Sequence, residues 1–250
     1  MRRVFANVLT AKKCESYAPI QENEAVWTLM SLWNNSEGYA DELHRYSLSV
    51  ARSIAFGERV QSHDEQFAKD VHRYMSNFSF AMTPGRYLFD SIPALRYLPR
   101  FMQPWMNQLE TFREFETNLC VENYRAALKL AENYPERPCI SKDVRREMEA
   151  LGLQDEEQAG STCMEILGTG SETTAVSLTW FIMACLLHPK CVKKAQEELD
   201  RIVGQERFPT WQDEANLPYV RAMIKEQHRW RTIAPLSKSS PKNESDNSLD

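Results

Sequence analysis

The sequence is poor in glycine, with 8 in 250 residues, and nearly lacks stretches in which apolar and polar residues alternate. Hairpins and half-buried strands depend on those features, so a β-sheet protein is not expected. An excess of basic residues is also missing, because the net charge is -5 and charges of both signs are interspersed. The sequence therefore does not favour binding to nucleic acid.

Metal-site and disulfide patterns are absent as well. The six cysteines include no CxxC pair and none has a histidine partner at the spacing of metal ligands. A zinc site or a disulfide framework is therefore not expected. We expect reduced thiols, most of them buried.

The chain also lacks a long uninterrupted apolar run. Its most apolar segment, residues 175–187, lies between Glu172 and His188, which is short of the roughly 20 apolar residues that a membrane span needs. The charged N-terminus has no apolar stretch behind it, so no signal peptide is predicted. As written, the chain is expected to be soluble and cytoplasmic, without a membrane span.

Helical periodicity fills most of the chain, and the predicted fold class is mainly α. The predicted helices span residues 2–9, 19–32, 40–55, 64–79, 102–130, 155–187, 189–203 and 219–231. Residues 81–104 carry four prolines among apolar residues and are predicted to form an ordered loop. Residues 237–250 are serine-rich and charged, and we expect them to be disordered.

The longest predicted helix contains the stretch Leu-Gly-Thr-Gly-Ser-Glu-Thr-Thr at residues 167–174. Asp155 is placed to cap its start, and His188-Pro189 ends it. A glycine inside a helix costs on the order of 1 kcal/mol relative to alanine. Two explanations remain open: a flat ligand approaches the backbone here, or a second helix packs closely on small residues. Glu172 and the hydroxyl groups favour the ligand.

Gly-x-Glu-Thr-Thr on a long helix resembles the oxygen-binding helix of the cytochrome P-450 family, the haem-thiolate monooxygenases. In that family the glycine makes room for haem and dioxygen, while the acid and the threonine relay protons for cleavage of the O–O bond. The resemblance assigns these roles to Gly170, Glu172 and Thr173. Thr169 stands where the family most often has alanine, and is implied to lie against the cofactor.

The resemblance extends to the segments on both sides of this helix. Downstream, Leu217-Pro218-Tyr219 precedes Glu226-x-x-Arg229, which resembles the structural Glu-x-x-Arg ion pair of the family. The same pattern at Glu42/Arg45 and Glu198/Arg201 is interpreted as ordinary solvated helix pairs.

Upstream, Met1-Arg2-Arg3 resembles the helix whose arginine meets a haem propionate, which implies a contact for Arg2. Residues 46–57 and 89–105 are similar to the fungal secondary-metabolite branch. Residues 89–105 correspond there to the roof of the substrate channel near the membrane. The plain interpretation of this stretch is a hydrophobic loop packed on the core, and the two interpretations are compatible.

The cysteine motif of the family, Phe-x-x-Gly-x-x-x-Cys-x-Gly, does not occur in these residues. That cysteine is the axial iron ligand, so we expect no metal ligand and only weak haem binding. The resemblance therefore predicts a partial cytochrome P-450 domain over residues 1–236, truncated at both ends. It would be the helical middle of the fold, with its β-sheets and cysteine haem loop missing, followed by the tail at 237–250.

Three functions remain open. The first is a monooxygenase-type chain, whose intact relatives use haem iron and a reductase to oxidise a lipophilic secondary metabolite and are typically anchored in the endoplasmic reticulum membrane. Without the axial cysteine, this chain is expected to be inactive alone. The second is a non-catalytic helical binding or interaction protein. The third is a gene fragment without function.

Overall fold

The computed structural model describes residue 6 and residues 9–233. Three predictions lie outside these residues: most of the helix at 2–9, the contact of Arg2, and the disordered tail at 237–250. The described chain divides into two compact units, one ending at Ala175 and the other beginning at Val176. Each unit is described by itself.

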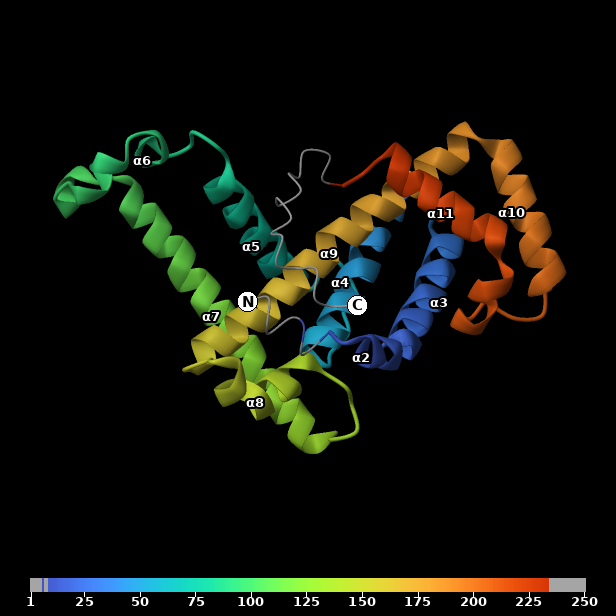
Figure 1. Cartoon of the computed structure of the whole chain (residues 1–250), viewed down its shortest axis with the longest axis horizontal. Coiled ribbons are helices and arrows are strands. Elements are labelled where there is room, and N and C mark those ends of the chain that lie inside the picture. The colour runs from blue at the N-terminus through green and yellow to red at the C-terminus, as the bar shows by residue number, and fades with distance from the viewer. Residues whose placement is uncertain (1–5, 7–8, 234–250) are drawn as a thin grey trace, which may run out of the picture. The chain divides into compact units, whose positions relative to one another are not determined.

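The first unit contains helices α2 to α8 and the first part of α9 (Figure 1). Its elements are α2 (Ala11–Ser16), α3 (Ala18–Asn34), α4 (Tyr39–Phe56), α5 (Gln66–Met82), α6 (Leu88–Ser91), α7 (Trp105–Asn133), α8 (Ile140–Leu151) and α9 (Glu156–Leu187), with short 3-10 turns η1 (Pro93–Tyr97) and η2 (Arg100–Met102). The long helices α5 and α7 pack together, and the segment with α6 joins them at their far ends.

The second unit is smaller and contains the end of α9, then α10 (Pro189–Ile202), the 3-10 turn η3 (Trp211–Asn216) and α11 (Pro218–Trp230). Helices α10 and α11 contact each other. Every regular element from residue 9 to residue 233 is a helix or a 3-10 turn, which confirms the predicted mainly α fold class.

Helix α9 begins and ends where the sequence predicts. The Asp155 carboxylate accepts a hydrogen bond from the backbone N–H of Gln158 at 2.9 Å, which caps the first turn. The helix ends at Leu187, one residue before His188-Pro189, because proline cannot continue the hydrogen-bonded ladder. By length and composition alone, α9 also meets the criteria for a membrane-crossing helix, whereas the sequence predicted no span, and one such helix is weak evidence for a span.

The first part of α9 is a core helix of the first unit. Its apolar residues Cys163, Met164 and Leu167 are fully buried. They belong to one cluster with apolar residues of α4, α5, α7 and α8, among them Phe56 and Tyr124. Burial on several sides explains why this helix is apolar around most of its circumference rather than on one stripe.

Helix α8 was not predicted. It has only a narrow apolar stripe, in which Ile140 and Val144 are fully buried, and charged residues surround that stripe. Spacing of four residues places both side chains on one helix face, where they meet the core. The connection between α7 and α8 is consequently confined to residues 134–139.

The apolar segment between α5 and α7 is ordered, but the alternative in which it packs on the core is wrong. Tyr97 is 90% exposed and Phe101 is 86% exposed. Only the base of the segment is packed, where Tyr87 stacks on Phe89 with ring centroids 5.2 Å apart. Its apolar residues therefore form an exposed surface of the first unit.

Two of the acid and arginine pairs that we interpreted as solvated have a buried member, Arg45 in the first and Glu198 in the second, whereas Arg201 is exposed. Arg45 is 5% exposed, and it binds Glu42 and Glu24 together. Glu198 is 6% exposed, and its carboxylate accepts hydrogen bonds from the backbone N–H groups of Tyr219 and Val220, each at 3.0 Å. Glu198 thus caps the first turn of α11, where a negative charge is favourable.

Candidate functional site

The stretch singled out in the sequence lies near the middle of α9, at the end of its buried part. Thr169 and Thr173 are one turn apart and both are exposed. The Thr173 hydroxyl donates to the Thr169 carbonyl at 2.7 Å, and the Thr169 hydroxyl donates to the Glu165 carbonyl at 2.8 Å. Both hydroxyls are therefore satisfied within the helix, as expected for threonines on a helix surface.

The two glycines of the stretch have different surroundings. A methyl group on Gly168 would lie 3.1 Å from the Met75 sulfur, so helix packing against α5 explains this glycine. A methyl group on Gly170 would lie 3.5 Å from the Ala51 side chain on α4, which is an ordinary contact. The close-packing alternative therefore accounts for Gly168, whereas the fold does not require glycine at position 170.

Ser47 on α4 holds this turn of α9 in place. Its buried hydroxyl lies 3.1 Å from the Gly170 carbonyl oxygen and also contacts the Ser171 carbonyl. A buried hydroxyl that bonds to the backbone of a neighbouring helix fixes the distance between the two helices. Ser47 and Ala51 are four residues apart, so two small side chains form the surface on which Gly170 rests.

Glu172 points away from the exposed threonine face. Its carboxylate lies 3.8 Å from the His44 imidazole, and its side chain is 37% exposed. Both residues line a cleft of about 750 Å³ between α4, α5 and α9, together with His72 and Ser171. Glu172 thus connects the turn that carries Thr173 with a polar, open cleft.

The predicted ion pair between Glu226 and Arg229 is formed in the second unit. The Arg229 guanidinium donates to the Glu226 carboxylate with an Nε–Oε2 distance of 2.7 Å. This hydrogen bond lowers the pKa of the Glu226 carboxyl. Both side chains are exposed, at 72% for Arg229 and 60% for Glu226, so the pair adds little to the stability of the described residues.

The cysteines were expected to be mostly buried, but only three of the six are. All six are free, and Cys120, Cys139 and Cys163 are buried. Burial raises the pKa of Cys120 to about 11 and that of Cys163 to about 12, so these thiols stay protonated. Among residues 9–233, no three histidine, cysteine or acidic side chains come together as metal ligands.

A known family matches nearly the whole chain. The family model for cytochrome P-450 matches residues 1–246. The chain belongs to the cytochrome P-450 family. The helices described above are the helical part of that fold.

The relatives are of the fungal secondary-metabolite type. The chain is 32% identical to the cytochrome P-450 monooxygenase polD of Polytolypa hystricis, over 94% of this chain and 46% of that protein. It is 30% identical to verL of Clonostachys rogersoniana and 31% identical to virE of Hypocrea virens, which it covers to 43% each. The chain therefore spans less than half the length of these cytochrome P-450 relatives.

The cytochrome P-450 family implies haem, and the residues of α9 fit one side of it. The hydroxyls of Thr169 and Thr173 are satisfied by their own helix, so an apolar disc can cover this exposed face without leaving them unpaired. The residues present do not supply a suitable thiolate for the haem iron. The buried cysteines Cys120 and Cys163 have raised pKa values, and the cysteine motif of the family is absent from the 250 residues.

Sequence reasoning missed two polar residues at this site, Ser47 and His44. Nothing in the local sequence links either residue to α9, because the contact is made by tertiary packing. The repeat of small residues at Ser47, Ala51 and Ala55 was the available signal. Small side chains at four-residue spacing are a sign of close helix approach.

Proposed function

We propose that this chain supplies the oxygen-facing helical part of a haem-dependent monooxygenase that acts on a lipophilic secondary metabolite. The match of the cytochrome P-450 family over residues 1–246 carries the proposal. Haem held by a cysteine thiolate, with electrons from a reductase, supplies oxygen-activating chemistry in such proteins. The 250 residues alone do not catalyse the reaction, since they contain no cysteine in the ligand motif.

The proposed role of this chain is to move protons. Glu172 is partly exposed in the cleft beside His44, so its carboxylate exchanges protons with solvent. Thr173 follows it in the chain, and its hydroxyl passes a proton onward when it rotates away from the Thr169 carbonyl. Gly170 and Thr169 form the wall beside this hydroxyl.

A cytoplasmic location of the 250-residue chain stays a prediction, which cell fractionation would test.

Haem reconstitution tests the proposal that the 250 residues alone do not hold haem through a thiolate and are therefore inactive. Haem is added to the purified 250-residue chain, which is then reduced, exposed to carbon monoxide and examined by absorption spectroscopy. We expect no thiolate-type Soret band and loss of the haem on gel filtration, because no cysteine of the ligand motif is present. Full-length polD serves as the control, and a thiolate-type band from the chain alone would contradict the proposal.

A chimera tests the role of the two relay residues. The chain replaces the matching 236-residue region of polD, so that polD contributes the remainder of the protein. Thr173→Ala and Glu172→Gln are each expected to slow product formation about a hundredfold, the lower end of the range for a lost proton-transfer group. The control is Thr174→Ala, which removes a neighbouring exposed hydroxyl and should have little effect. Equal loss in all three variants would refute the assigned roles.

A further inference from the structure

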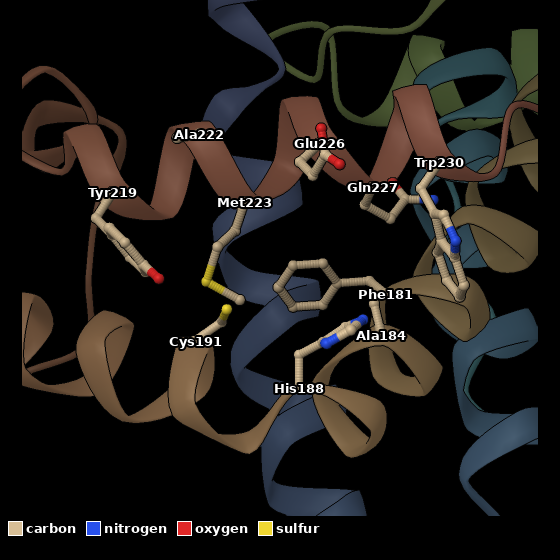
Figure 2. Close-up of a pocket in the computed structure, with 10 residues that line it drawn as sticks. All are labelled: Phe181, Ala184, His188, Cys191, Tyr219, Ala222, Met223, Glu226, Gln227 and Trp230. Carbon is tan, nitrogen blue, oxygen red and sulfur yellow. The ribbon is translucent and has the colours of Figure 1, made fainter.

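The second unit contains an apolar cavity beneath α11 (Figure 2). Its volume is about 280 Å³, just below the range of about 300–1,000 Å³ that is typical of ligand pockets. Phe181 on α9 and Met223 and Trp230 on α11 supply most of its apolar lining. His188 and Cys191 also line it and are exposed, so the cavity is accessible from solvent.

One buried polar group in this cavity has no partner. Gln227 on α11 is 4% exposed, and its Oε1 atom accepts a hydrogen bond from the Ser177 hydroxyl at 3.3 Å. Its Nε2 donor is buried without a hydrogen bond. Leaving a buried donor unsatisfied costs about 1–3 kcal/mol, so a group that supplies an acceptor there gains free energy.

Two other polar groups around the cavity have partners of their own, Glu226 and the pair of Tyr219 and Cys191. Glu226 binds Arg229, with 2.7 Å between Oε2 and Nε. The Tyr219 hydroxyl interacts with the Cys191 thiol, which raises the pKa of the tyrosine. The cavity thus combines a mainly apolar wall with few donors, namely the buried Gln227 amide and the ring N–H groups of His188 and Trp230, a combination that fixes the orientation of a small ligand.

We propose that this cavity binds a compact, mainly apolar molecule that carries one hydrogen-bond acceptor, such as a ketone or ester carbonyl. The carbonyl oxygen accepts from Gln227 Nε2, which is buried and reaches the cavity once the Gln227 side chain turns toward it, and the apolar body lies between Phe181, Met223 and Trp230. The site shares no residue with the turn at Thr169–Thr173. It is therefore independent of the proposed monooxygenase function.

Two probes of nearly equal shape test the site. Acetophenone carries the carbonyl acceptor, whereas α-methylstyrene replaces the oxygen with a CH₂ group. Binding of each to the 250-residue chain is measured by ligand-observed NMR titration. We expect acetophenone to bind about tenfold more tightly, which corresponds to one hydrogen bond of about 1.4 kcal/mol. Equal affinity, as when water already satisfies Gln227, would overturn the proposal.

Variants of the chain locate the binding. Gln227→Leu keeps the side-chain volume but removes the donor, so the two probes should bind equally. Ala184→Phe fills the cavity and should abolish the binding of both, with Ala222→Phe as a second filling variant if the first does not fold. Gln196→Leu on the exposed face of α10 is the matched control and should keep the tenfold preference. A preference that survives Gln227→Leu, or binding that survives both filled cavities, would place the probes elsewhere and refute the site.

Discussion

Replacing Gly160 with alanine is expected to lower the free energy of unfolding by about 3 kcal/mol, the upper part of the range for overpacked cores. A methyl group at this position would lie 2.7 Å from the carbonyl oxygen of Cys120 and 3.3 Å from the Tyr124 side chain. Since the nearest atom belongs to the backbone of α7, no side-chain rotation relieves the clash. Helices α7 and α9 must separate.

Three glycines of one helix make this prediction testable in a matched series. Gly168→Ala should cost less than Gly160→Ala, because its nearest neighbour is the flexible Met75 side chain. Gly170→Ala makes only an ordinary contact, and it should leave the stability unchanged or raise it by up to about 1 kcal/mol through better helix propensity. Urea unfolding followed by far-UV circular dichroism measures all three. Equal stability of Gly160→Ala and Gly170→Ala would show that α7 and α9 are not in backbone contact.

The second large effect is expected at Arg45, where Arg45→Met should destabilise the chain by about 3 kcal/mol. The guanidinium donates to Glu24 at 3.0 Å, to Thr28 at 2.9 Å and to the Val60 carbonyl at 3.0 Å. It also binds Glu42 at 2.7 Å. Removing the guanidinium takes a donor from the buried acceptors of Glu24, Thr28 and Val60, although Glu24 keeps its hydrogen bond from Arg59.

The control for Arg45 is Arg125→Met, which breaks an ion pair with Glu156 at 2.8 Å on the surface. Because Arg125 is 66% exposed, its loss should cost at most about 1 kcal/mol. The double variant Glu24→Met/Arg45→Met should recover part of the loss, since the buried carboxylate is removed together with its partner. Similar costs for Arg45→Met and Arg125→Met in urea unfolding would contradict the buried network.

The same network gives stability a dependence on pH. Burial raises the pKa of the Glu24 carboxyl, but hydrogen bonds from Arg59 and Arg45 outweigh burial and hold the pKa below its ordinary value. In the unfolded chain, the Glu24 carboxyl has the ordinary glutamate pKa of about 4.3. The contribution of Glu24 is therefore complete above that pH and is lost as the pH falls through the lower folded value. Glu24→Gln should reduce this acid dependence.

How much the sequence could predict differs between the fold and the site. The ends of α4, α9 and α10 were found to within one or two residues, because their apolar patterns, prolines and capping residues are local signals. Helix α8 was missed because its apolar stripe, in which Ile140, Val144 and Met148 meet the core, is narrow among many charges. The burial of Arg45 and Glu198 could not be predicted, since their partners come from other elements.

For the site, the local motif placed Thr169, Gly170, Glu172 and Thr173 on one helix correctly. What it could not provide was the direction in which each residue points. Glu172 faces His44 on α4, whereas Thr173 is exposed and bonds to its own helix. The reason for Gly168 was also hidden, because the Met75 sulfur that fills its space belongs to a helix far away in the sequence.

The buried carboxylate of Glu198 makes the start of α11 depend on α10. The opening turn of α11 starts with a proline and takes two of its hydrogen-bond acceptors from Glu198 rather than from a residue next to it in the chain. The first turn of α11 is therefore complete only while α10 is folded beside it, so the two helices stabilise each other and should unfold together.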